Sequence, residues 1–241
     1  MNSKEHQVSK VNYQVILDKT IKEDSQLNSD KRLLLHACCA PCSSYCIEYL
    51  SGIYNIVIYF FNPNITDKEE YEKRADEIKR FVNEFNGQYC GKASRYFEGR
   101  TCKEVSVIFG EYRPQDFFEI ARGLEKEKEG GARCYKCYEQ RLRSTVQAAK
   151  EGGYDYFSTT LSISPYKRAN WLNEIGGRLS GEMGVPYLFS DFKKKNGYRR
   201  SIELSAQYGL YRQDFCGCIY SKVESELKRE AVNTIDYSCR K

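Results

Sequence analysis

Apolar runs and amphipathic stretches alternate along much of this 241-residue chain. Residues 32–37 form a short apolar run, and residues 54–64 begin with a second run that is rich in β-branched and aromatic side chains. Both runs have the length and composition of buried strands. Residues 43–50 have the pattern of a helix, and Thr66 or Asp67 can cap a longer helix through about residue 86.

The same alternation returns in the second half of the chain. Helical spacing over residues 134–150 is followed by a predicted strand at 154–161, a helix through about Met183 and a fourth predicted strand at 185–189. Because parallel strands need long crossover connections, this order predicts a Rossmann-like α/β fold, a mostly parallel sheet flanked by helices. Such sheets bind ligands beyond the carboxyl ends of their strands, where we expect a metal site.

We expect three parts along the chain. Residues 1–30 are polar, with one weak amphipathic piece, and should form an arm or short helix on the main body. Residues 31–230 form the main α/β domain, and residues 231–241 form a C-terminal tail. Residues 88–133 inside the main domain have a less regular pattern, and we predict no strand or helix there.

The composition of the chain indicates its cellular location and the kind of chemistry it carries out. No stretch approaches the roughly 18 to 20 apolar residues of a membrane span, and the start MNSKEHQVSK lacks the apolar segment of a secretory signal, so we expect a cytoplasmic protein without a membrane partner. The net charge of +5 is too small to indicate a partner. Eleven cysteines in tight groups, in a reducing compartment, indicate metal ligands or redox chemistry.

The first cysteine group ends the first apolar run. Cys38 and Cys39 are adjacent, so both can reach one centre only if the backbone bends, which the following Ala-Pro pair permits. A multinuclear centre accepts ligands from two directions, whereas a single zinc usually takes a C-x-x-C pair. Cys42 and Cys46 complete the group. Free cysteines are otherwise small buried apolar side chains, which describes Cys46 equally well.

A second group, Cys134 and Cys137, forms a C-x-x-C at the predicted start of a helix. The free N–H groups at a helix start favour the thiolate over the thiol. Together with Cys38 and Cys39 the pair makes a four-thiolate set, which is typical of an iron–sulfur cluster or zinc. Thiols without any metal are the alternative.

The third group is Cys216-Gly217-Cys218. A C-x-C pair can bind metal, or it can close into a small strained disulfide of the labile, catalytic kind. Two thiols that cycle to a disulfide carry two electrons, which is what a reductase needs. We therefore interpret Cys216 and Cys218 as a redox-active pair.

A basic and aromatic stretch precedes the third group. Its cations can neutralise phosphates, and its tyrosines can stack on bases, so we interpret it as an RNA contact, although a solvated loop would explain the lysines equally well. The predicted RNA-binding residues are Lys193, Lys194, Lys195, Arg199 and Arg200. The segment TTLSISPYK ends another predicted strand and offers hydroxyls and a lysine as a substrate or phosphate contact.

Five segments together resemble one family. They are HACCAPC, FFNPNI with the downstream EEYEKR, RCYKCYEQRL, TTLSISPYK and FKKKNGYRRSIELSAQYGLYRQDFCGCIYS. In this order, over about residues 31–225, they resemble the QueH-type epoxyqueuosine reductases. The resemblance implies reduction of the epoxide of epoxyqueuosine, the modified wobble base of certain tRNAs, to the cyclopentene of queuosine. Nothing in the sequence resembles a cobalamin site, as in the QueG-type enzyme for this reaction.

The resemblance also implies cofactors and roles. Cys38, Cys39, Cys134 and Cys137 match the ligands of a 4Fe-4S cluster, and Cys216 and Cys218 match the redox-active pair. Cys42 matches a position that can join a second metal, such as a mononuclear iron, beside the cluster. The implied partners are tRNA carrying epoxyqueuosine and an unidentified electron donor, and we expect a monomer. Candidate proton donors are His36, Tyr166 and Tyr220.

Two other functions fit parts of the sequence. A zinc-stabilised RNA-binding module without catalysis would use the same cysteines and cations. Rossmann-like proteins that activate an RNA base with ATP also use cysteines, but they normally carry a Gly-rich or Ser-Gly-Gly phosphate loop after the first strand, where this chain has CCAPC.

Overall fold

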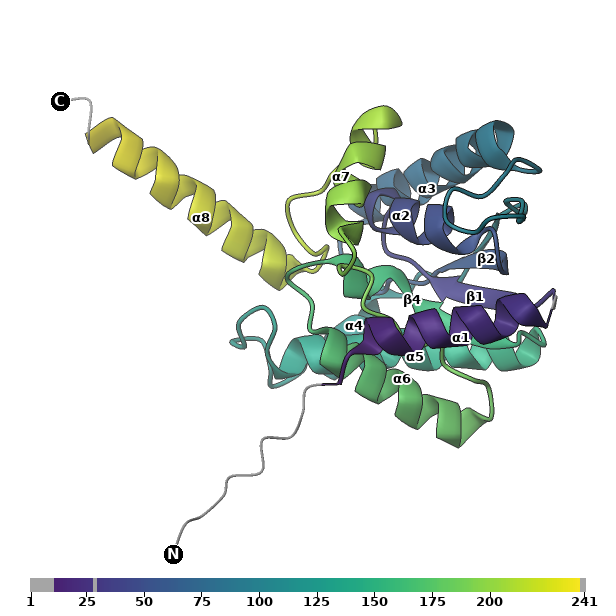
Figure 1. Ribbon diagram of the computed structural model, residues 1–241. Coiled ribbons are helices and arrows are strands. Elements are labelled where there is room, and N and C mark those ends of the chain that lie inside the picture. The colour runs from purple at the N-terminus through teal and green to yellow at the C-terminus, as the bar shows by residue number, and fades with distance from the viewer. Residues whose placement is uncertain (1–10, 28–29, 239–241) are drawn as a thin grey trace, which may run out of the picture.

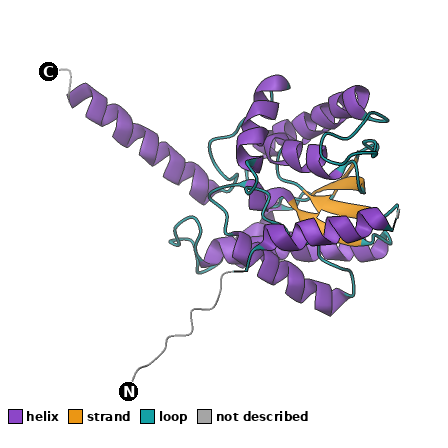
Figure 2. Cartoon of the chain, viewed as in Figure 1, coloured by secondary structure: helices purple, strands orange, loops and turns teal. Residues whose placement is uncertain are grey.

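The computed structural model describes residues 11–27 and 30–238, with side chains as far as residue 230. Its sheet has the strand order β3-β2-β1-β4, and every pair of neighbouring strands is parallel. Helices enclose the sheet (Figure 2), and the α/β prediction is confirmed. The strands are β1 (Arg32–His36), β2 (Asn55–Phe60), β3 (Ser106–Phe109) and β4 (Tyr156–Thr159).

Two groups of helices cover the two faces of the sheet. α2, α3 and α7 lie on one side, and α5 and α6 lie on the other (Figure 1). α8 extends away from the body. The helices are α1 (Tyr13–Gln26), α2 (Ala40–Leu50), α3 (Lys68–Tyr89), α4 (Pro114–Ala121), α5 (Ala132–Glu151), α6 (Ala169–Met183), α7 (Gly197–Gln207) and α8 (Ile219–Ser238), with a short 3₁₀ helix, η1 (Thr160–Ile163), after β4.

Side chains of β1 alternate between two apolar cores. Leu33 and Leu35 pack with α1, α2 and α3, whereas Leu34 packs with α5 and α6. All three are fully buried, because successive residues of a strand point to opposite faces and both faces here are covered. Each such leucine contributes roughly 1.5–3 kcal/mol by leaving water. The two cores hold β1 in the middle of the sheet.

α3 begins where the sequence predicts a capped helix. The side chain of Asp67 accepts the backbone N–H groups of Glu69 and Glu70 at 3.1 and 3.3 Å. These N–H groups have no partner within the helix, so the cap satisfies them. The helix then runs to Tyr89, slightly past the predicted end, and buries one apolar face that includes Ile78 and Phe85.

The prediction of a fourth strand at residues 185–189 is wrong. Residues 185–189 make only an isolated bridge, between Phe157 and Tyr187. Pro186 has no N–H to donate to a ladder, and the side chain of Ser158 donates to the Leu188 carbonyl at 2.8 Å. The fourth strand is instead β3, which lies within residues 88–133, where the sequence predicts no strand or helix. It is a four-residue, half-exposed edge strand, so its sequence shows little apolar pattern.

α1 lies within the segment predicted as an arm or short helix. Four apolar residues mark the amphipathic piece in the sequence, namely Val11, Val15, Ile16 and Ile21. Of these, Ile21 is buried together with Leu17, whereas the other three are exposed, so the predicted apolar face is correct only at Ile21. Residues 1–10, 28–29 and 239–241, which include parts of the predicted arm and tail, lie outside the described residues. In the described part of the chain, no helix is both long and apolar enough to cross a membrane.

Candidate metal and redox site

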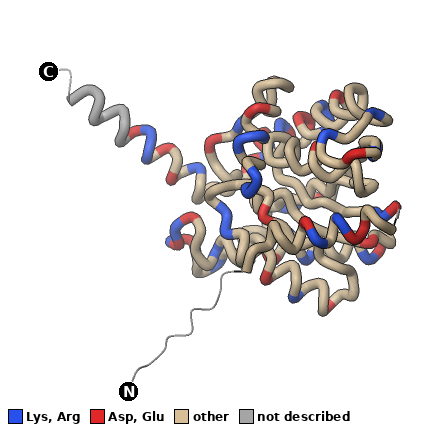
Figure 3. The backbone as a smooth tube through the Cα atoms, in the orientation of Figure 1, with Lys and Arg blue, Asp and Glu red and all other residues tan. Residues whose placement is uncertain are grey.

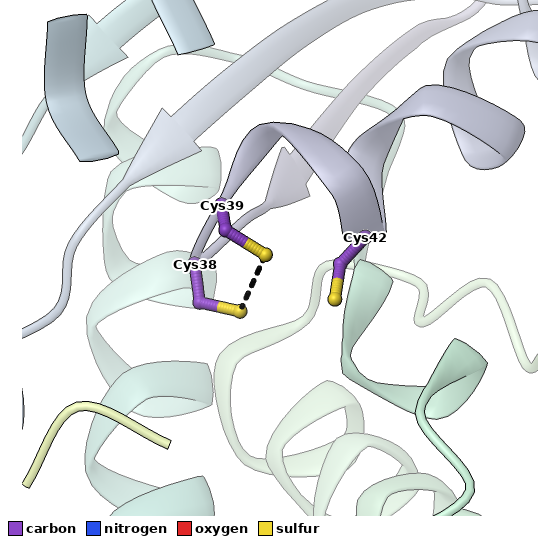
Figure 4. Close-up of side chains that lie close together, drawn as sticks. All are labelled: Cys38, Cys39 and Cys42. Carbon is purple, nitrogen blue, oxygen red and sulfur yellow. Dashed lines mark hydrogen bonds between the residues drawn. The ribbon is translucent and has the colours of Figure 1, made fainter. Parts of the chain in front are cut away.

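Three cysteine sulfurs meet where β1 turns into α2. Cys39 occupies the N-cap position of α2 with an extended backbone, and Pro41 follows in the first helical turn. This turn brings Cys42 to the same side as Cys38 (Figure 4). The sulfurs of Cys38, Cys39 and Cys42 all lie within 4.8 Å of one another, and in the described part of the chain this is the only such group. The bend that the sequence requires is therefore present.

Hydrogen bonding among these thiols shifts their pKa values in opposite directions. Cys38 Sγ and Cys39 Sγ lie 3.8 Å apart. Hydrogen bonds with Cys39 and then Cys42 lower the pKa of Cys38 well below its usual value, and the same hydrogen bond raises the pKa of Cys39 to about 12. The hydrogen bonds from its two neighbours therefore favour a thiolate at Cys38, while Cys39 and Cys42 keep their protons. A metal bound here would displace the remaining protons.

A second set of sulfurs lines a small adjoining hollow. Cys134 and Cys137 come from the first turns of α5, and Cys216 and Cys218 come from the loop before α8. Cys216 also lines a larger hollow of about 300 Å³ together with Cys38 and Cys42. Cys216 therefore lies between the two sets of sulfurs.

The loop that carries Cys216 is fixed by a buried arginine. Arg74 of α3 is 1% exposed, pairs with Glu70 at 2.6 Å, and donates from its two terminal nitrogens to the carbonyls of Phe215 and Cys216 at 3.3 and 3.2 Å. Gly217 has φ +117°, and a Cβ there would lie 2.9 Å from Ile65. Only glycine fits between the two cysteines without strain.

Buried cations surround the sulfurs. Arg141 is 1% exposed, and neither of its terminal nitrogens has a hydrogen-bond partner. Lys167 is 9% exposed and donates to Cys216 Sγ at 3.2 Å. Burial lowers the pKa of Lys167, but the neighbouring Cys216, Tyr138 and Cys38 outweigh it and raise the pKa well above its usual value.

The donor set fits a thiolate-bound metal group. Buried cations are costly unless anions balance them. Arg141 of α5 has two terminal nitrogens without a hydrogen-bond partner, and it interacts electrostatically with Cys137, Cys216 and Cys38. Sulfur ligands select zinc, copper(I) or iron–sulfur clusters. The residues present therefore suit an anionic, sulfur-held metal centre, without distinguishing iron from zinc.

The predicted thiolate character of the C-x-x-C pair is wrong for the free thiols. Burial raises the pKa of Cys134, and it raises the pKa of Cys137 to about 11. The Gly130 N–H does donate to Cys134 Sγ, at 3.3 Å, in the expected direction. Desolvation outweighs the helix terminus because both sulfurs are packed against the core.

The three candidate proton donors occupy different surroundings. His36 is fully buried, bonds to Thr159 Oγ1 and the Phe61 carbonyl, and has its pKa lowered to about 3 by burial. Its neutral ring holds three strand ends together. Tyr220 lies against Arg133, with the guanidinium 4.3 Å from the ring centre. Tyr166 lines the 300 Å³ hollow and is 77% exposed.

Sequence reasoning missed two contacts to the sulfurs. The Gln213 side chain donates to Cys39 Sγ at 3.0 Å, and Lys167, expected only to contact substrate or phosphate, reaches Cys216. Lys167 ends the segment TTLSISPYK, which follows a predicted strand, but nothing in its spacing indicates a cysteine partner. Gln213 carries no such signal.

Comparison with known proteins identifies the family. The sequence model described as "Epoxyqueuosine reductase QueH" matches residues 33–224. A protein of that name from Staphylococcus epidermidis is 41% identical over 226 residues, which is 93% of this chain and 90% of the relative. The chain belongs to the QueH family of epoxyqueuosine reductases. Membership in this family makes the chain an oxidoreductase.

Other members of the QueH family are similar along most of their length. The protein of that name from Streptococcus pyogenes is 41% identical over 88% of this chain and 78% of its own. The one from Thermotoga maritima is 30% identical over 83% of this chain and 95% of its own. The match begins at β1 and ends within α8, so it includes every cysteine group described above.

Most of the predicted RNA-binding cations are already paired within the chain. Figure 3 shows acidic and basic residues interspersed around α7. Lys194 has no ion pair among the described residues and lines a hollow of about 570 Å³ with Arg168 and Trp171. The paired cations are Lys193 with Asp191, Lys195 with Asp18, Arg199 with Glu203, and Arg200 with Glu48 and Glu203.

Proposed function

We propose that this protein reduces the epoxide of epoxyqueuosine in tRNA to the alkene of queuosine, using a 4Fe-4S cluster and no cobalamin. The observation that carries the proposal is Cys216, which lines both sulfur-bearing hollows and contacts the buried Lys167. A redox thiol beside a metal-binding sulfur group and an open hollow is what a reductase of a bulky substrate requires.

The reaction balances with the two thiols of the loop. An epoxide becomes an alkene and water when it takes up two electrons and two protons. Oxidation of the Cys216 and Cys218 thiols to a disulfide releases two electrons and two protons. Glycine between them, at positive φ, lets the short loop bend. The electron donor that reduces the disulfide again stays a prediction, as does the monomeric state.

Four cysteines are proposed as cluster ligands. Cys38 and Cys39 come from the turn after β1, and Cys134 and Cys137 come from the start of α5. Cys42, which the geometry groups with Cys38 and Cys39, is proposed to join a second metal, a mononuclear iron. When bound, the iron would supply electrons one at a time and a Lewis acid for the epoxide oxygen.

Side chains of the hollow have distinct proposed roles. Lys167 keeps its proton at Nζ and donates to Cys216 Sγ at 3.2 Å, which positions that sulfur. Gln213 orients the Cys39 sulfur through its 3.0 Å hydrogen bond. Arg74 holds the backbone of the redox loop against α3. Each of these groups acts before the substrate arrives, so the site is preorganised.

The proposed partner is tRNA, consistent with the predicted cytoplasmic location. Lys193, Lys194 and Lys195 are proposed to contact phosphates, together with Arg199 and Arg200 of α7. The exposed ion pairs of Lys195 with Asp18 and of Arg199 with Glu203 are weak, so these two cations can exchange to phosphate at little cost. Arg200 also holds the buried Glu48, so it would contact phosphate while keeping that pair. Lys194, which has no ion pair among the described residues, should contribute the largest share.

The experiment that tests the function is a turnover assay. The anaerobically reconstituted protein is incubated with tRNA carrying epoxyqueuosine and a chemical reductant, and the digested nucleosides are analysed by mass spectrometry. We expect epoxyqueuosine to lose one oxygen atom and become queuosine. Cys90, which is exposed and outside the cysteine groups, offers the control: Cys90→Ala should retain turnover. Unchanged epoxyqueuosine with a protein that contains its metal would contradict the proposal.

A further inference from the structure

Tyr166 is an exposed aromatic side chain on a fixed backbone. Its exposed fraction, 77%, is the greatest among the exposed large apolar side chains of the described residues. The Tyr166 N–H donates to Ser164 Oγ at 3.3 Å, and the Lys167 N–H donates to the Ser164 carbonyl at 3.2 Å. These hydrogen bonds hold the backbone at Tyr166, and the exposed ring has its faces available to a ligand.

Three hollows of the surface meet at this tyrosine. The first, of about 300 Å³, contains Cys38 and Cys216. The second, of about 590 Å³, lies between the loop before α5 and the first part of α8. The third, of about 370 Å³, reaches Cys42 and Arg212. Tyr166 is the one residue that lines all three, so a ligand that reaches the sulfurs passes beside its ring.

The second hollow has the side chains that a nucleobase requires. Leu227 of α8 is 60% exposed and lines the same hollow as Tyr166, to which it adds an apolar surface. Glu224 Oε1 accepts from the Glu129 N–H at 3.2 Å and Glu129 Oε2 accepts from Ser221 Oγ at 3.4 Å, so each carboxylate has its other oxygen to offer to base N–H groups. Lys128 and Lys228 offer positive charge to phosphate. Proteins hold unpaired bases by stacking them on aromatic faces and bonding their edges in this manner.

We propose that the hollow between Tyr166 and α8 binds a nucleobase, and that the Tyr166 ring is its stacking face. The base is the one whose attached group reaches the sulfurs through the adjoining 300 Å³ hollow, which Glu129, Glu224 and Lys228 also line. This inference rests on the proposed function. It assigns Tyr166 to substrate binding and removes it from the candidate proton donors.

The state of the tyrosine hydroxyl supports stacking over proton transfer. The Tyr166 hydroxyl makes no hydrogen bond with the described residues, and only its backbone N–H is bonded. A proton donor is normally oriented by a hydrogen-bond partner, and no described residue orients this hydroxyl. A stacking ring needs no such partner.

Three variants test the assignment. Tyr166→Phe retains the ring and should leave both kcat and KM within about twofold of the unmodified protein. Tyr166→Ala should raise KM about tenfold or more, with little change in kcat, because a stacked base is held by roughly 1–3 kcal/mol. Phe118→Ala, at an exposed aromatic outside these hollows, is the matched control and should leave KM unchanged.

Two outcomes would overturn the assignment. Loss of kcat in Tyr166→Phe would make the hydroxyl the functional group. An unchanged KM in Tyr166→Ala would mean that no base stacks on the ring. Equilibrium binding of the same tRNA to the metal-loaded protein separates this inference from the proposed function. If the unmodified protein shows no turnover, an affinity that falls in Tyr166→Ala but not in Phe118→Ala still supports the base site, and equal affinities refute it.

Discussion

Buried charge dominates the site at the scale of single residues. Arg74, Arg141 and Lys167 are each at least nine-tenths buried and lie around sulfur atoms. Burying an isolated cation costs several kcal/mol, and the carboxylate of Glu70 pairs with only one of the three. The lowered pKa of Cys38 supplies one compensating negative charge, and a thiolate-bound metal group would supply the rest.

Two cysteine substitutions should have different consequences. Cys134→Ala removes a proposed cluster ligand, so we expect it to lose both visible absorption and turnover. Cys216→Ala removes one redox thiol and should retain the absorption while losing turnover by at least about a hundredfold, because each reaction needs both thiols. Anaerobic absorption spectra and the turnover assay measure the two effects. If Cys216→Ala turns over normally with ordinary reductants, the redox-pair proposal is wrong.

Spacing in the sequence found the cysteines but not their neighbours. C-x-x-C and C-x-C are local patterns, so Cys134, Cys137, Cys216 and Cys218 stand out in the printed sequence. The contact between Lys167 and Cys216 joins residues 49 positions apart, and it depends on how the loop before α8 folds back. No local pattern encodes that contact.

At the scale of elements, α3 links the core to the redox loop. One face of α3 packs in the core with Ile78 and Phe85, and Arg74 on the same helix binds the loop that carries Cys216. At its N-terminus Asp67 caps the helix and pairs with Lys222 of α8 at 3.1 Å. The position of this one helix therefore affects both the loop and the start of α8.

Loss of the Asp67 cap should destabilise the fold. Asp67→Ala leaves the N–H groups of Glu69 and Glu70 without their acceptor, which should cost about 1 kcal/mol of unfolding free energy. Asp67→Asn retains a capping oxygen and should cost less, since the exposed pair with Lys222 contributes little. Chemical denaturation of the three proteins measures the difference. Equal unfolding free energies for Asp67→Ala and the unmodified protein would contradict the role of the cap.

The same cap predicts a pH dependence. The hydrogen bond from Lys222, followed by the N–H bond from Glu70, lowers the pKa of Asp67 in the folded protein. A lowered pKa stabilises the fold above the unfolded value of about 3.9, and this contribution is lost as the pH falls through the folded pKa. The advantage of Asp67 over Asn should therefore be present at neutral pH and shrink in acid.

Elements were predictable where burial leaves a strong pattern. β1, β2 and β4 are buried, and their apolar runs appear in the sequence. β3 is exposed at the sheet edge, so its four residues look like loop. Residues 185–189 have the composition of a strand, but only Phe157 exchanges backbone hydrogen bonds with them. The ladder does not continue because Pro186 lacks an N–H and the side chain of Ser158 donates to the Leu188 carbonyl. Tertiary contacts determine whether these two segments form strands, and the local sequence pattern does not contain that information.

At the scale of the whole molecule, the parallel sheet gathers distant segments at one edge. The carboxyl ends of β1 and β4 lead directly to Cys38 and to the segment with Lys167. α5 and the loop before α8 add Cys134 and Cys216 to the same region, which shares two adjoining hollows. The predicted location of the site follows from the topology, because ligands of such sheets bind beyond the carboxyl ends of the strands.

The most direct test of this account is the metal content of the protein prepared without oxygen. Iron, acid-labile sulfide and zinc are measured on one sample together with its visible spectrum. The account predicts a brown protein with about four iron and four sulfide per chain, and additional iron if Cys42 holds a second metal. A colourless protein that contains zinc and no sulfide would contradict it and favour a zinc-stabilised RNA-binding protein.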